Sequence, residues 1–372
     1  MDIKRVQILV EKYIEGAATP EEEAELINWY RQSNEQQMEW LEEKDAVRLR
    51  MLSNIEAQTG AVRIRTIRLW PRIAAAASII LALSVTGYFI LHKSSQSQYA
   101  HNDIKPGHNQ ATLTLANGRK IILTKGLNGN LAQQGNTLIA ANQGESVIYT
   151  AQQNTDQPIS YNTLSTGKGE QSPYPLILAD GSKVMLNALS SITFPTSFNG
   201  GDRTVKITGE VLFEVKHDQR HPFRVTANDK TIEDIGTQFD VNAYDDEPAF
   251  KTTLIEGAVK VSQGSQYKLL KPGQQAFVQN GTIVIKEVDP ENEIAWRNGK
   301  FRADGEKLDE IMRQASRWYD VEVVYENDAL RNQAFGIIGN RYANVAELLH
   351  SLELTQKVKF KINGKTITVI KP

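Results

Sequence analysis

Apolar and polar positions change their pattern along the chain and predict separate structural parts. In residues 1–52 apolar side chains recur at helical spacing, and Thr19-Pro20-Glu21-Glu22 forms a capping box with proline at the first helical position. The same capping pattern recurs at residues 33–36. We therefore expect three short helices, the second of which carries Leu26, Trp29 and Tyr30.

Residues 73–91, IAAAASIILALSVTGYFIL, contain no charged side chain. A helix of this length covers roughly 28 Å, close to the hydrocarbon core of a bilayer at about 30 Å. A buried helix of a soluble protein would show a polar stripe, and this segment has none. A signal peptide would lie nearer the start of the chain. We therefore predict a single transmembrane helix over residues 73–91.

The charges that flank this helix predict its orientation. Basic residues gather on the cytoplasmic side of a membrane. Residues 61–72 hold four arginines, whereas the tether over residues 92–103 and the positions just after it hold only Lys93 and Lys105. We expect the protein in a bacterial inner membrane, with its N-terminus cytoplasmic and its C-terminus, from residue 92 on, periplasmic.

From residue 104 to about 290 apolar and polar positions alternate, and helical spacing is nearly absent. Residues 113–123 and 176–186 agree at six of eleven positions around Asn117-Gly118 and Asp180-Gly181, which predicts a repeated type I′ hairpin. Further turn signals occur at Gly200-Gly201, Glu256-Gly257, Pro272-Gly273 and Asn280-Gly281. We predict one all-β domain of short strands; the sequence leaves a sandwich and a solenoid equally open.

After Asp289-Pro290 helical spacing returns, and Lys307–Tyr319 places Leu308, Ile311, Met312, Ala315 and Trp318 on one face. The order is strand, helix, two strands, helix, two strands, with a closing hairpin at Asn363-Gly364. This predicts a compact C-terminal α+β domain over residues 291–372, with two helices on one sheet. The whole chain is thus expected to be multidomain, with a small all-α unit, one transmembrane helix, an all-β domain and an α+β domain.

Composition excludes several kinds of site. The chain has no cysteine, which excludes disulfides, thiolate metal sites and a cysteine nucleophile. His217 and His221 are neighbours on a turn, so we interpret them as loop histidines and expect no metal and no cofactor. Residues 1–60 hold thirteen acidic and seven basic side chains, which favours a basic protein partner over nucleic acid. The alternative is a passive cytoplasmic tail.

Several long blocks occur in order along the predicted β domain: LILADGSKVMLNALSSITFP, RTVKITGEVLFEVKHDQRHPFRV, IGTQFDVNAY, TLIEGAVKV and LLKPGQQ. Together they resemble the FecR family of transmembrane anti-sigma regulators. The N-terminal LVEKYIEGAATPEEEAELINWY resembles the sigma-binding segment of that family, and residues 291–372 resemble its attached domain, which is similar to the short secretin/TonB-type fold. The chain departs from the family at Met185, where a tryptophan-like residue is usual, and at Asp234-Ile235, where members are more apolar.

The resemblance implies a signal relay in iron or glycan uptake. The cytoplasmic helices would hold an extracytoplasmic-function sigma factor, and the periplasmic part would sense a TonB-dependent outer-membrane transducer. From their apolar surface beside acidic charge we expect Leu26, Trp29 and Tyr30 to bind the sigma factor. We expect unknown residues of the distal C-terminal domain to bind the transducer. A bitopic cell-envelope glycan-binding protein is the alternative. A membrane-tethered enzyme would need a pair of nucleophile and base, and the sequence indicates none.

Some members of this family cut themselves at a Gly-Thr bond, and Gly236-Thr237 within DIGTQFDV matches that bond. The threonine hydroxyl would attack the preceding carbonyl to form an ester, and glycine would allow the strained backbone this requires. A hydroxyl needs a base. On a continuous strand Asp234 and Asp240 would share a face that excludes Thr237, so no base is predicted. The alternative is a plain junction of turn and strand.

Overall fold

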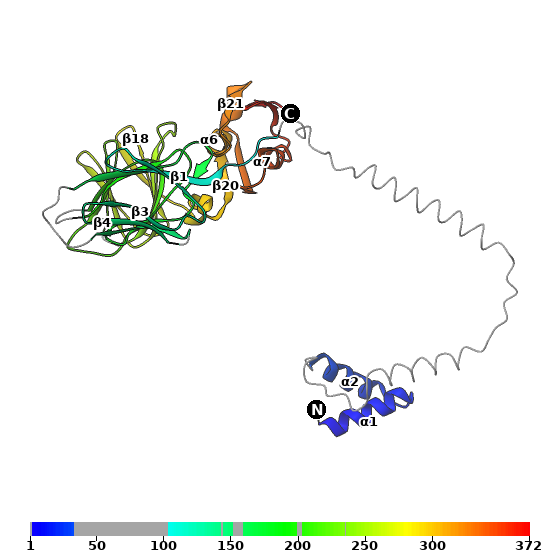
Figure 1. The fold of residues 1–372 in the computed structure, drawn as a ribbon. Coiled ribbons are helices and arrows are strands. Elements are labelled where there is room, and N and C mark those ends of the chain that lie inside the picture. The colour runs from blue at the N-terminus through cyan, green and yellow to red at the C-terminus, as the bar shows by residue number, and fades with distance from the viewer. Residues whose placement is uncertain (1, 33–102, 143, 152–158, 199–202, 235) are drawn as a thin grey trace, which may run out of the picture. The chain divides into compact units, whose positions relative to one another are not determined.

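The computed structural model describes residues 2–32, 103–142, 144–151, 159–198, 203–234 and 236–372. It divides into two units, Met1–His92 and Lys93–Pro372, each of which is described by itself (Figure 1). Within the described residues no helix is long and apolar enough to cross a membrane. The predicted third helix and the predicted transmembrane helix over residues 73–91 lie outside the described residues.

The first unit contains helices α1 (Ile3–Ile14) and α2 (Pro20–Gln32). The predicted capping box is confirmed: Glu22 N donates to Thr19 Oγ1 at 3.3 Å, and Thr19 N donates to Glu22 Oε2 at 3.1 Å. Lys12 of α1 pairs with Glu22 at 2.7 Å, and Val6 and Leu9 are buried. The two helices therefore form a small hairpin held by a few apolar side chains.

The second unit begins with nineteen strands that form two sheets (Figure 1). The first sheet has the order β2, β1, β6, β10, β11, β12, β13, β16, β17, and the second has the order β3, β4, β5, β8, β9, β11, β14, β15, β18, β19. The short strand β7 pairs with the start of β1. The strands are β1 (His108–Thr114), β2 (Lys120–Thr124), β3 (Gly129–Gln134), β4 (Thr137–Asn142), β5 (Ser146–Ala151), β6 (Tyr161–Ser165), β7 (Glu170–Gln171), β8 (Leu176–Ile177), β9 (Lys183–Leu186), β10 (Ser191–Pro195), β11 (Arg203–Glu214), β12 (Phe223–Ala227), β13 (Lys230–Asp234), β14 (Gln238–Ala243), β15 (Phe250–Glu256), β16 (Val259–Gln263), β17 (Gln266–Leu270), β18 (Gln274–Gln279) and β19 (Thr282–Glu287).

Strand β11 belongs to both sheets. Its first half pairs with β10 and β12, and its second half, from Gly209 on, pairs with β14. Gly209 has φ +73°, and a Cβ there would meet Ser190 Oγ at 2.4 Å, so the bend requires glycine. The sheets share one core, in which Phe213 of the second contacts Phe223 of the first at 6.0 Å between ring centroids. Most strand pairs are antiparallel, which identifies a sandwich and not a solenoid.

The two repeated hairpins form, but the predicted turn type is wrong. Gly118 N donates to Leu115 O and Gly181 N donates to Leu178 O in the same way, and the two glycines have φ values of +82° and +91°. Neither Asn117 nor Asp180 has a positive φ, so each turn is type I followed by a glycine bulge. The type I′ turn is found at Asn280-Gly281, where both φ values are positive.

The C-terminal domain, residues 291–372, has the predicted order of strands and helices. The predicted apolar face of α6 is confirmed, since its five residues are all buried. The prediction of a single sheet was wrong. Strand β20 pairs with β22 alone, whereas β21 pairs in parallel with β24, which also pairs with β23. The order of elements does not show which strands pair. The elements are α5 (Pro290–Glu293), η2 (Ala295–Asn298), β20 (Lys300–Lys307), α6 (Leu308–Tyr319), β21 (Glu322–Tyr325), η3 (Asp328–Asn332), β22 (Ala334–Asn340), α7 (Val345–Glu353), β23 (Lys359–Asn363) and β24 (Thr366–Ile370).

Residues 103–107, which precede the first strand, lie against the C-terminal domain. The Asp103 carboxylate accepts from Ala346 N at 3.1 Å in the first turn of α7, and Ile104 O accepts from Val345 N at 2.9 Å. Asn344, the residue before α7, makes no side-chain cap of its own. A residue far away in the sequence therefore caps this helix.

Candidate functional site

The predicted Gly236-Thr237 bond lies in a turn between β13 and β14. Thr237 Oγ1 donates to Asp234 Oδ1 at 2.5 Å, and Gly236 N donates to Asp234 Oδ2 at 3.0 Å. Asp234 is 1% exposed and Thr237 is 6% exposed. Since β13 ends at Asp234 and β14 begins at Gln238, the rule of alternating strand faces does not apply across this turn. The prediction that Asp234 cannot face Thr237 was wrong.

Gly236 fits a position that no other residue could occupy without a shift of its neighbours. Its φ is +143°, and a Cβ would meet His217 Cα at 2.5 Å and His217 Nδ1 at 2.6 Å. The backbone here is thus held in a conformation that L side chains rarely adopt. The carbonyl carbon of the Gly236-Thr237 bond belongs to this residue.

Gly257 fixes the rotamer of Thr237 from the other side. A Cβ on Gly257 would meet Thr237 Cγ2 at 2.3 Å, so the threonine methyl fills the space that this glycine leaves. Thr237 O accepts from Val215 N at 2.8 Å. With its methyl and its carbonyl both held, Thr237 presents its hydroxyl to the Asp234 carboxylate. The arrangement pairs a nucleophile with a general base in a buried site.

The predicted sigma-binding residues lie on α2 and are described in part. Leu26 and Trp29 are half-buried, and the Tyr30 side chain lies outside what the structure describes. On α1 the structure adds Val10, Tyr13 and Ile14, which are exposed and spaced to share one face; Ile14 is 73% exposed. The helical spacing of these residues was visible in the sequence, but their exposure was not.

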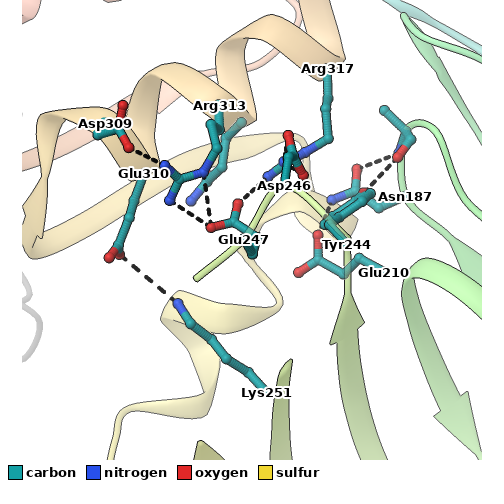
Figure 2. Close-up of polar contacts among 12 residues, drawn as sticks. Asn187, Glu210, Tyr244, Asp246, Glu247, Lys251, Asp309, Glu310, Arg313 and Arg317 are labelled. Atoms are coloured by element: carbon teal, nitrogen blue, oxygen red, sulfur yellow. Dashed lines mark hydrogen bonds and ion pairs between the residues drawn. The ribbon is translucent and has the colours of Figure 1, made fainter. Parts of the chain in front are cut away.

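A dense ionic cluster joins the β domain, residues 104–290, to helix α6 (Figure 2). Arg317 donates to both Asp246 oxygens at 2.9 Å and to Glu247 Oε1 at 2.6 Å. Arg313 donates to Glu247 Oε2 at 2.7 Å and pairs with Asp309. Asp246 and Glu247 closely follow the C-terminal end of β14, and β14 begins directly after Thr237. The cluster therefore holds the end of β14 that lies away from Thr237.

A second group of polar side chains lies beside this cluster. Asn187 Nδ2 donates to Glu210 Oε2 at 2.5 Å, and Arg341 of the C-terminal domain donates to Asn187 Oδ1 at 2.9 Å. Burial raises the pKa of Glu210 to about 7, while burial lowers the pKa of Arg341 to about 10. The Arg317 guanidinium stacks on the Tyr244 ring at 3.9 Å. The two domains therefore meet through buried polar groups.

The two neighbouring histidines have different surroundings. His217 lies against Gly236, whereas His221 Nδ1 lies 2.9 Å from Asp218 Oδ2. Across the described residues no group of three or more histidine, aspartate or glutamate side chains could hold a metal ion.

The family profile for FecR protein matches residues 162–260, and the profile for FecR, C-terminal matches residues 300–369. Two crystal structures of a candidate anti-sigma factor from Parabacteroides distasonis ATCC 8503 share the fold, with TM-scores of 0.53 and sequence identities of 24% and 23%. They cover 56% and 57% of this chain and 99% of their own chains. None of the curated proteins compared with the chain matches it. Both profiles fall on the second unit in the order in which its two domains occur, and the chain belongs to the FecR family.

Proposed function

We propose that this protein is a membrane-anchored anti-sigma factor. Its acidic N-terminal helices hold an extracytoplasmic-function sigma factor, and its second unit senses a TonB-dependent outer-membrane transducer. The observation that carries the proposal is the pair of FecR profiles on the second unit. The fold shared with a candidate anti-sigma factor supports it.

The exposed apolar side chains of the first unit support a protein partner. Tyr13 and Ile14 are exposed on α1, and Leu26 and Trp29 are half-buried on α2, whose first turn is acidic. Aromatic anchors of this kind often contribute about 2 kcal/mol or more each to binding. Tyr30 is the third residue of α2 that we expect to contact the sigma factor. A pull-down with residues 1–72 from the cells of the source bacterium should yield a sigma factor, and the loss of that protein with Trp29→Ala distinguishes specific binding from a passive tail.

The membrane placement follows from residues 73–91 and from the arginines before them. A reporter that is active only in the periplasm should work when fused after Tyr99 and stay silent when fused after Asn54. The opposite result would reverse the orientation and contradict the relay.

We place the transducer contact on the C-terminal domain. Its three-stranded sheet ends at β21 and β23, whose outer edges carry no partner strand among the described residues. An unpaired edge can take up a strand from a partner. Val324 on β21 and Ile338 on β22 are exposed apolar side chains nearby in the same domain. Deletion of this domain should abolish the response to the stimulus and leave sigma binding intact; a response that persists would assign sensing to the β domain.

A second activity, self-cleavage at Gly236-Thr237, is favoured by the hydrogen bond between Thr237 and Asp234. Asp234 accepts the hydroxyl proton while Thr237 Oγ1 attacks the Gly236 carbonyl carbon, and the peptide becomes an ester that water hydrolyses. The chain acts once on itself and is not a turnover enzyme. The six residue pairs between β11 and β14 would then hold the two fragments together.

A further inference from the structure

The loop between β11 and β12 lies against Gly236. His217 in this loop lies so close to Gly236 that its Cα, Cβ and Nδ1 would all fall within 2.6 Å of a Cβ placed there. The imidazole therefore lies beside the glycine whose carbonyl carbon is attacked. It is also exposed, so it can exchange protons with solvent.

One buried arginine holds both ends of this loop. Arg203 is 4% exposed; its Nη1 donates to Lys216 O at 2.9 Å, and its Nε donates to His221 O at 2.8 Å. The same Nη1 lies 2.7 Å from Asp180 Oδ2, which neutralises the charge. Ser182 Oγ donates to Asp180 and accepts from Lys216 N at 3.1 Å. The loop is therefore fixed in place, and His217 is fixed with it.

We propose that His217 is the acid–base group of the cleavage reaction and that Arg203 is its positioning residue. The inference rests on the proposed self-cleavage, in which Asp234 takes the hydroxyl proton but the leaving nitrogen still needs one. Histidine is the side chain best suited to give and take protons near neutral pH. Lys216 and Asp218 flank His217 in the loop, and Asp218 is engaged with His221. Asp234 accepts from Gly236 N on the facing turn.

The reaction begins with the Asp234 carboxylate and the His217 imidazolium. Asp234 takes the proton of Thr237 Oγ1, the oxygen bonds to the Gly236 carbonyl carbon, and the bond to Thr237 N breaks as His217 protonates that nitrogen. The neutral imidazole then takes a proton from water, and the remaining hydroxide bonds to the ester carbon. The bond to Thr237 Oγ1 breaks, and Asp234 returns the proton to that oxygen. One water is consumed, and the new Gly236 carboxyl group passes its proton to the Thr237 amine, which leaves a carboxylate and an N-terminal ammonium group.

The test follows the full-length chain made in a cell-free system, sampled over time and run denatured. His217→Ala should slow cleavage by about 100-fold or more, the usual size of an acid–base contribution. Imidazole added to this variant should restore part of the rate. His221→Ala is the matched control and should cleave like wild type, because its ring pairs with Asp218 and not with Gly236.

Hydroxylamine at neutral pH separates the two steps, because under these mild conditions it cuts an ester and leaves the peptide bonds intact. If ester accumulates in His217→Ala, hydroxylamine releases the fragments at once, which supports the role of His217 in hydrolysis. Arg203→Lys should slow cleavage less than His217→Ala, with thermal unfolding measured to confirm that it folds. Wild-type cleavage with an equally fast His217→Ala would overturn this inference alone, whereas an uncut wild type would overturn the self-cleavage on which it rests.

Discussion

Arg317 of helix α6 donates to Glu247 of the β domain at 2.6 Å, and their side chains are only 5% and 4% exposed. Glu247 accepts from Arg313 as well, so one carboxylate pairs with two arginines from one helix. Its pKa is pushed up by burial, but hydrogen bonds and charge from Arg313 and Arg317 outweigh this and leave the pKa lowered. The carboxylate thus stays charged at the domain boundary.

Loss of this carboxylate should destabilise the second unit strongly. Glu247→Ala leaves two arginines without their buried partner, a change that typically costs about 3–5 kcal/mol. Urea unfolding followed by the fluorescence of Trp296 and Trp318, both buried, measures it. Glu214→Ala is the control, because its pair with Lys183 is exposed and contributes about 1 kcal/mol or less. Equal losses for the two variants would contradict this role of the cluster.

The same lowered pKa gives the pair a pH dependence. A carboxylate whose pKa is lowered in the folded state stabilises the fold at pH values above its pKa in the unfolded state. This stability disappears as the pH falls through the pKa of the folded state. The difference between wild type and Glu247→Ala should therefore be full at pH 7 and shrink in acid.

Glu306 should show the opposite pH dependence. Burial, with repulsion from Glu293, raises its pKa to about 8. Between the ordinary glutamate pKa of 4.5 and the raised pKa of about 8, the folded state holds a proton that the unfolded state has released. The free energy of unfolding therefore falls as the pH rises through this window. Glu306→Gln should raise the unfolding free energy by about 1–2 kcal/mol at pH 9 and leave it unchanged at pH 4. The exposed Glu322→Gln is the control, and a gain that is equal at both pH values would refute the assignment.

Thr237 carries the proposed cleavage. A tagged wild-type chain run denatured should split near residue 236, Thr237→Ala should stay whole, and Thr237→Ser should still split because it keeps the hydroxyl. Asp234→Asn keeps the size of the side chain but is a poor base, and it should slow cleavage by about 100-fold or more. A wild-type chain that stays at full length under all conditions would leave Asp234 and Thr237 as a structural turn.

The sequence predicted those features that depend on residues close together along the chain. The capping box at Thr19 and the buried face of α6 depend on residues a few positions apart, and both are found. The contact of Thr237 with Asp234 was missed because alternation of faces holds only within a strand, and the strand ends at Asp234. The capping of α7 by Asp103 could not be predicted from the sequence, since its partner Ala346 is 243 residues away.

The departure of Asp234 from the apolar residue usual in the family pointed to the site without explaining it. The carboxylate accepts both from Gly236 N and from Thr237 Oγ1, which an apolar residue could not do. The signal in the sequence was thus a polar residue at a usually apolar position, and only the folded turn shows what that residue contacts.

Sigma-dependent transcription shows directly whether the N-terminal helices hold a sigma factor, as we propose. The most direct measurement is transcription by core RNA polymerase from the promoter served by the sigma factor that residues 1–72 capture. Added residues 1–72 should suppress that transcription, and Tyr13→Ala with Ile14→Asp should relieve the suppression by about 30-fold in affinity or more. Lys4→Ala, on an exposed polar position of the same helix, should suppress like wild type. Transcription that continues undiminished with wild-type residues 1–72 would contradict the account.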